Sequence, residues 1–164
     1  MQALVSGGES ETVELKKSTA HLYRAAEILC GMLNGAGGVV LSGVTDGDEI
    51  IGQQVADNTL REVTASVREF KPSAPVQVER VPVAACREVI ALVAAPDSSL
   101  GQWVYRGQPW RRIGPTTSPM AQEDLVRHIL LRPLARLSGR RCLPSAMGSM
   151  TSTTSRSSDG PPRY

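Results

Sequence analysis

The sequence has few aromatic residues, few cysteines and no long apolar run, and each shortage excludes a class of protein. Aromatic side chains make up 4% of the 164 residues, so a broad aromatic platform for stacking bases is not expected. The three cysteines are isolated and odd in number, which gives neither a disulfide framework nor a Cys-x-x-Cys zinc spacing. No apolar run approaches the roughly 20 residues that span a bilayer, so we expect no membrane partner.

The first eight residues also lack a targeting signal. Met1–Gly8 carries no basic side chain and no long apolar core, so we expect no signal peptide. We therefore expect the protein to be cytoplasmic. We interpret 1–8 as a flexible N-terminus, 9–131 as one domain and 132–164 as a separate tail.

The charge is divided unevenly between the domain and the tail. Residues 1–131 carry 12 basic and 15 acidic side chains, whereas 132–164 carry six arginines and only Asp159. A nucleic-acid surface on the domain must therefore come from local clustering, with the tail adding non-specific attraction. The tail is rich in Ser, Thr, Gly and Pro and has little to bury, which predicts disorder. It could serve as a solvated spacer or as a phosphate-binding arm.

Hydrophobic periodicity predicts an α+β fold. The expected helices cover 18–34, 58–70 and 121–131, and the expected strands cover 11–16, 39–44, 50–51, 76–81 and 88–94, followed by a hairpin over 102–113. This order predicts a mixed, mainly antiparallel sheet with helices packed on it. Residues 45–49 and 115–117 are expected to be turns.

Acidic residues around the first strand form the first candidate site. Glu9 and Glu14 lie five residues apart where a loop enters the strand, close to Lys16. Asp46 follows a glycine-rich segment and a buried strand, where it is free to approach other carboxylates. A solvated edge strand and a plain glycine helix cap are the alternative interpretations.

Arginines around Trp110 form the second candidate site. In a hairpin, Arg106, Arg111 and Arg112 place guanidinium groups near an aromatic ring, an arrangement suited to phosphate. The alternative is a surface hairpin whose arginines pair with the excess acidic residues. His21 and His128 have no partners at a recognisable spacing, so both are expected at the surface and no catalytic triad is predicted.

Taken in order, these segments resemble the Schlafen AlbA_2 family over about residues 9–131. Glu9-Ser10 through Glu14-Leu15-Lys16 is similar to its E-S-x-x-x-E-F-K opening, and the segment 33–38 to its A-x-x-N-T-x-G-G. The strand that ends at Asp46 resembles its G-V-x-D, and 105–117 resembles its Y-x-R-x-G-x-x-T. The resemblance implies a compact domain that binds DNA or RNA.

In one branch of this family the resemblance also implies a metal-dependent endoribonuclease that acts on structured RNA such as tRNA. Position by position, the catalytic and metal-binding carboxylates fall on Glu9, Glu14 and Asp46, which would hold Mg²⁺ or Mn²⁺. Nucleic-acid contacts then fall on these cationic residues: Lys16, Arg106, Arg111 and Arg112. No organic cofactor is expected. A homodimer would supply the second domain that the animal proteins carry in one chain.

The sequence therefore leaves three candidate functions. The first is a nucleic-acid-binding domain and the second is the endoribonuclease. The third is a regulatory domain that binds a protein or a small ligand, which the net acidic charge of residues 1–131 mildly favours.

Overall fold

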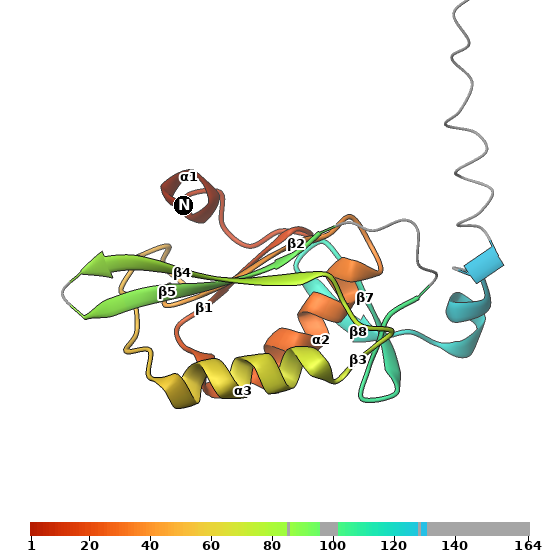
Figure 1. Ribbon diagram of the computed structural model, residues 1–164. Coiled ribbons are helices and arrows are strands. Elements are labelled where there is room, and N and C mark those ends of the chain that lie inside the picture. The colour runs from red at the N-terminus through yellow and green to blue at the C-terminus, as the bar shows by residue number, and fades with distance from the viewer. Residues whose placement is uncertain (85, 96–101, 128, 131–164) are drawn as a thin grey trace, which may run out of the picture.

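The chain forms two four-stranded sheets with two long helices between and beneath them (Figure 1). The computed structural model describes residues 1–84, 86–95, 102–127 and 129–130. Its elements are α1 (Gln2–Val5), β1 (Val13–Lys16), η1 (Thr19–His21), α2 (Leu22–Leu33), β2 (Gly38–Ser42), α3 (Asp57–Arg68), β3 (Phe70–Lys71), β4 (Val76–Ala84), β5 (Arg87–Ala94), β6 (Val104–Tyr105), β7 (Gln108–Ile113) and β8 (Thr116–Pro119). The α+β prediction is confirmed.

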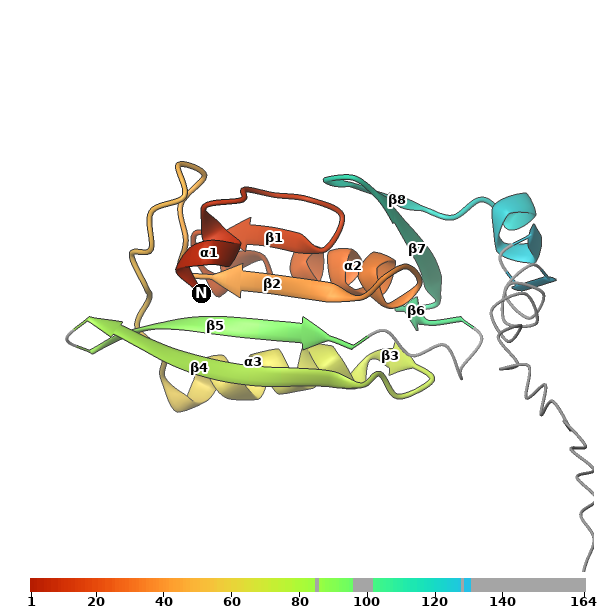
Figure 2. The same cartoon turned by 90° about the horizontal axis from the view of Figure 1, so that it is seen from above.

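The first sheet has the strand order β1-β2-β5-β4 (Figure 2). β1 and β2 are parallel because α2 connects them, and β2 pairs antiparallel with β5. β4 and β5 form an antiparallel hairpin, as the sequence predicts. The sheet is therefore mixed, and β1 is one of its edges.

A second sheet, which the sequence analysis did not separate from the first, has the order β3-β6-β7-β8. Its central hairpin turns at Arg106 and Gly107, whose φ angles of 51° and 79° are those of a type I′ turn. The segment predicted as a turn at 115–117 contributes instead to β8, which pairs with β7. β3 and β6 are two residues long, too short to show a period of two in the sequence.

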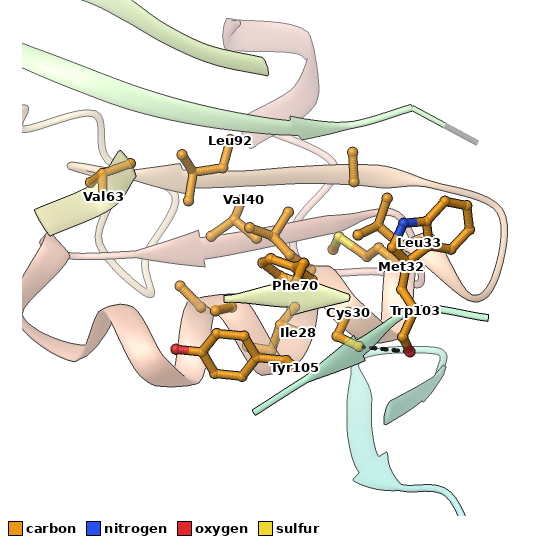
Figure 3. Close-up of a cluster of buried hydrophobic side chains, with 14 of the residues drawn as sticks. Ile28, Cys30, Met32, Leu33, Val40, Val63, Phe70, Leu92, Trp103 and Tyr105 are labelled. Atoms are coloured by element: carbon orange, nitrogen blue, oxygen red, sulfur yellow. Dashed lines mark hydrogen bonds between the residues drawn. The ribbon is translucent and has the colours of Figure 1, made fainter. Parts of the chain in front are cut away.

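The main core lies between α2, α3 and the inner faces of both sheets. α2 buries every residue from Ile28 to Leu33. Phe70, Tyr105 and Trp103, which directly precedes β6, close the core on the side of the second sheet (Figure 3). Cys30 lies in this core, and burial raises the pKa of its thiol to about 12. Burying this apolar surface is the main contribution to stability.

The opposite face of the first sheet carries a smaller apolar cluster, which includes Val13, Leu15 and Leu41. α1 lies over this face, and Val5 is fully buried there. No element is predicted in residues 1–8 from the sequence, because a four-residue helix is only about one turn long and a hydrophobic stripe cannot repeat within it.

The described chain ends in a helical segment. A helix was expected over 121–131; residues 122–127 and 129–130 are helical, and Ile129 and Leu130 are 48% and 63% exposed. Leu131, His128 and the tail over 132–164 lie outside the described residues. Within the described residues, no helix is long and apolar enough to cross a membrane.

Asn34 joins α2 to the second sheet. Its side-chain Oδ1 accepts a hydrogen bond from the Trp103 N–H at 2.9 Å, and Nδ2 donates to the carbonyls of Trp103 at 2.9 Å and Trp110 at 3.0 Å. The glycines that follow close the end of the helix: the Gly35 and Gly37 N–H groups both donate to the Met32 carbonyl. This agrees with the helix-cap interpretation of the glycine-rich segment.

We predict that Asn34→Ala destabilises the protein by about 3 kcal/mol, because it removes the three hydrogen bonds that the Asn34 side chain makes with the backbone of Trp103 and Trp110. Urea unfolding followed by circular dichroism measures the change. Asn58→Ala is the matched control, since Asn58 is exposed and its side chain donates to Glu62 one turn along the same helix, and a change of about 0.5 kcal/mol is expected there. Equal, small losses in both variants would contradict this role of Asn34.

Candidate functional site

Glu14 is a buried carboxylate on an edge strand. Side chains alternate along β1, so Val13 and Leu15 enter the smaller cluster while Glu14 and Lys16 point to the side of α2. Glu14 is only 4% exposed. A carboxylate at this depth needs cationic or hydrogen-bonding partners to offset the loss of water.

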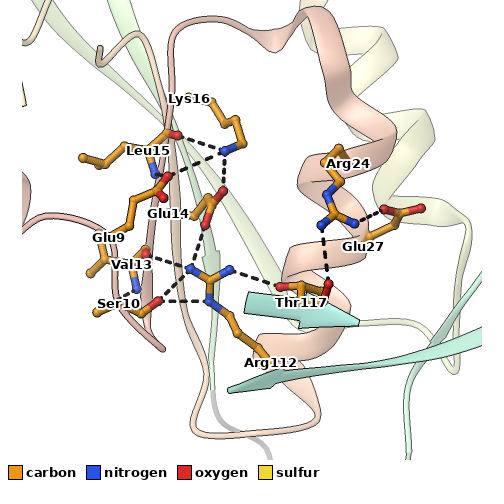
Figure 4. Close-up of polar contacts among 10 residues, drawn as sticks. All are labelled: Glu9, Ser10, Val13, Glu14, Leu15, Lys16, Arg24, Glu27, Arg112 and Thr117. Carbon is orange, nitrogen blue, oxygen red and sulfur yellow. Dashed lines mark hydrogen bonds and ion pairs between the residues drawn. The ribbon is translucent and has the colours of Figure 1, made fainter. Parts of the chain in front are cut away.

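Two cations hold the Glu14 carboxylate (Figure 4). Lys16 Nζ contacts Oε1, and Arg112 Nη2 donates to Oε2 at 2.7 Å. Glu9 reaches the same lysine from the preceding loop: its Oε1 lies 3.7 Å from Lys16 Nζ and accepts the Leu15 N–H at 3.2 Å. The structure thus brings together four of the predicted site residues, Glu9, Glu14, Lys16 and Arg112, with one ammonium group between two carboxylates.

Arg112 is the most deeply buried cation in this cluster, with a side chain 1% exposed. Its Nε and Nη2 donate to the Ser10 carbonyl at 3.0 and 2.6 Å, and Nη2 also approaches the Val13 carbonyl at 3.1 Å. Nη1 donates to Thr117 Oγ1 at 3.1 Å. Arg112 was expected to contact phosphate, but the structure places it in the interior, where it positions Glu14.

Gly31 makes room for this arginine. A Cβ at Gly31 would lie 3.1 Å from Arg112 Cβ and from its backbone nitrogen, so α2 can approach β7 closely only with glycine at this position. The sequence analysis did not single out Gly31. A glycine inside an otherwise good helix pattern is the signal that could have found this crossing.

Asp46 lies apart from this cluster. It sits in the exposed turn over 45–49 that follows β2, where the Asp48 N–H donates to the Thr45 carbonyl at 3.0 Å. Among the described residues, no group of three or more His, Cys, Asp or Glu side chains could hold a metal ion. The three-carboxylate metal site stays a prediction.

The other two predicted arginines are exposed and paired with carboxylates. Arg106, at the type I′ turn, forms a two-pronged pair with Glu69, in which Nη2 lies 3.1 Å from Oε1. That hydrogen bond lowers the pKa of Glu69 and raises the pKa of Arg106. Arg111 faces away from Arg112 and lies 3.3 Å from Asp124. This pairing matches the surface-hairpin interpretation, but it leaves the Arg106 guanidinium exposed and that of Arg111 partly accessible, with its Nε buried.

A further cation, Arg24, lies near Trp110 and was not predicted from the sequence. Arg24 on α2 pairs with Glu27 at 2.8 Å, and its Cζ lies 6.0 Å from the centroid of the Trp110 ring. Its Nη2 also reaches the Thr117 carbonyl at 3.4 Å. In the sequence Arg24 is only a polar position on an amphipathic helix, so no local pattern marks it.

Comparison with known proteins supplies a family and a fold. The family model described as Schlafen, AlbA_2 matches residues 9–121. Among solved structures, the DIP2311 protein from Corynebacterium diphtheriae is similar, with a TM-score of 0.51 and 16% sequence identity. The match covers 72% of this chain and 23% of that one, so the chain spans about a quarter of that protein's length. No curated protein matches the sequence.

We predict that Arg112→Ala destabilises the protein by about 3 to 5 kcal/mol, because it leaves the Glu14 carboxylate buried without its strongest partner. Its neighbour on the same strand is the matched control. Arg111→Ala removes only an exposed ion pair, so a change of at most about 1 kcal/mol is expected. Urea unfolding of both variants decides the matter. Similar losses at the two positions would show that the buried pair has no special role.

Proposed function

Because the chain belongs to the Schlafen AlbA_2 family, we propose that its domain binds nucleic acid, DNA or RNA, through the phosphate backbone. The family match over residues 9–121 carries this proposal, and it includes every cation predicted to make contact. We assign the contacts to Lys16, Arg106 and Arg111. Arg112 supports them indirectly, through Glu14.

The exposure and pairing of these cations support the proposal. The side chains of Lys16, Arg106 and Arg111 are 29%, 61% and 42% exposed. The ion pairs of Arg106 and Arg111 are exposed and contribute about 0 to 1 kcal/mol, so a phosphate can replace their carboxylate partners at little cost. Lys16 instead shares its charge between Glu14 and the more exposed Glu9, and a phosphate would replace Glu9. Release of counterions from the nucleic acid then favours binding at low salt.

We expect Arg106→Ala and Lys16→Ala each to weaken oligonucleotide binding and to lower the slope of log K against log salt by about 0.7 to 0.9, the value for one phosphate contact. Fluorescence anisotropy over a range of salt concentrations measures the slope. Arg80→Ala is the matched control, because Arg80 is also exposed and paired with a carboxylate, that of the half-buried Glu88, but on the β4–β5 hairpin. Slopes unchanged in all three variants would contradict the assigned contacts.

A metal-dependent endoribonuclease is the second candidate function. The observation that favours it is the convergence of Glu9 and Glu14 on one positive charge, since carboxylate oxygens are the ligands that Mg²⁺ and Mn²⁺ prefer. As placed, however, Asp46 does not complete the set of three, and Glu14 is already held by Lys16 and Arg112. The arrangement does not fit the three-carboxylate metal site, so we derive no catalytic step through a metal.

A cleavage assay separates the two functions. If the domain is a nuclease, Mn²⁺-dependent cuts in tRNA are expected to disappear in Asp46→Asn and Glu9→Gln, whereas Asp48→Asn, in the same turn, keeps them. Glu14 is avoided because its loss disturbs the buried pair. Binding without cuts would leave a binding domain, and neither binding nor cuts would favour the regulatory alternative. The homodimer stays a prediction.

A further inference from the structure

A cavity of about 530 Å³ opens at one end of the first sheet, apart from Glu9, Glu14 and Arg112. β1 and β2 end there and β5 begins there (Figure 2). Its described lining includes the following polar or small residues: Lys17, Ser18, Gly52, Gln53, Gln54 and Arg87. The carboxyl ends of parallel strands are a common place for ligands in sheets that carry crossover helices.

Gln53 supplies a buried donor that has no acceptor. It is only 9% exposed, and its Oε1 accepts from the Thr19 N–H at 3.0 Å and lies 3.3 Å from Thr19 Oγ1. Both of its backbone groups pair with Glu88. Nε2 is left buried without a hydrogen-bond partner. Because Thr19 fixes which end of the amide is the oxygen, the orphaned group of this cavity-lining residue is a donor, and it calls for an oxygen acceptor.

The charge around this donor is positive. Lys17 is exposed and makes no ion pair with any described residue. Arg87 is anchored at the cavity by two hydrogen bonds from Nε and Nη2 to the Gly52 carbonyl, at 3.3 and 2.9 Å. No described residue lining the cavity is acidic. The nearest acidic neighbour in sequence, Glu88, is taken by Arg80, with contacts of 2.7 and 3.0 Å.

We propose that this cavity binds a phosphate group, with one phosphate oxygen accepting from Gln53 Nε2 and the charge balanced by Lys17 and Arg87. An amide donor flanked by two cations suits an anion with several oxygens. The phosphate comes either from a nucleic-acid backbone or from a free nucleotide, and the chemistry of recognition is the same. The site stands on its own geometry and does not depend on the contacts assigned to Lys16, Arg106 and Arg111.

The side-chain amide of Gln53 is a direct reporter of this site. In ¹H–¹⁵N spectra of the full chain, titration with inorganic phosphate or adenosine 5′-monophosphate is expected to shift its resonances saturably, and those of the Ser18 and Gly52 amides with them. Sodium chloride at equal ionic strength controls for screening. No saturable shift with phosphate, mononucleotide or oligonucleotide overturns the proposal.

Substitutions test the assigned groups. Gln53→Glu keeps the oxygen that Thr19 needs but replaces the donor with a negative charge, so we expect at least a tenfold loss of phosphate affinity, the equivalent of one charge-assisted hydrogen bond. Lys17→Ala is expected to weaken binding severalfold, whereas Lys71→Ala, an exposed lysine on β3, leaves it unchanged. Thermal unfolding verifies that Gln53→Glu is folded. Unchanged affinity in folded Gln53→Glu overturns the proposal.

An oligonucleotide without terminal phosphates separates this inference from the proposed function. If it shifts the Gln53 amide and competes with free phosphate, the occupant is a backbone phosphate. If phosphate and mononucleotide bind but the oligonucleotide does not, the site stands and nucleic-acid binding fails. If the oligonucleotide binds while Gln53 responds to none of the three, nucleic-acid binding stands and this site is wrong.

Discussion

One buried guanidinium group holds the two halves of the domain together. Arg112, on the second sheet, donates to two carbonyls in and before β1 and to the Glu14 carboxylate, while its other end meets Thr117 on β8. A pair removed from water to this degree contributes little net stability compared with apolar residues of the same size. Its effect is on geometry, because it ties β1 and the segment before it to β7 and β8.

The same interaction limits what the acidic cluster can do. Both oxygens of Glu14 face cations, so this carboxylate acts mainly on the position of Lys16. Glu9 is 40% exposed and shares the lysine from the solvent side. An external phosphate or cation therefore exchanges first with the outer pair, Glu9 and Lys16, while the inner pair, Glu14 and Arg112, stays in place.

Sequence reasoning predicted the elements whose hydrophobic period is long enough to be seen, such as α2 and the β4–β5 hairpin. It did not predict α1, β3 or β8, because each is four residues or shorter and is fixed by its tertiary neighbours. The candidate site shows the same limit. Arg111 and Arg112 are adjacent on a strand, so alternation predicts that they face opposite ways, but only the docked sheet decides which one is buried.

The distribution of paired charges explains how a domain with excess acidic residues can attract an anion. Arg24, Arg80, Arg106 and Arg111 each have a carboxylate partner on the surface, so their charge is largely neutralised at a distance. Lys17 and Arg87 have no acidic partner among the described residues, and they meet at the cavity where Gln53 Nε2 lacks an acceptor. These two cations therefore lie together at the end of the first sheet, although the summed charge of residues 1–131 is negative.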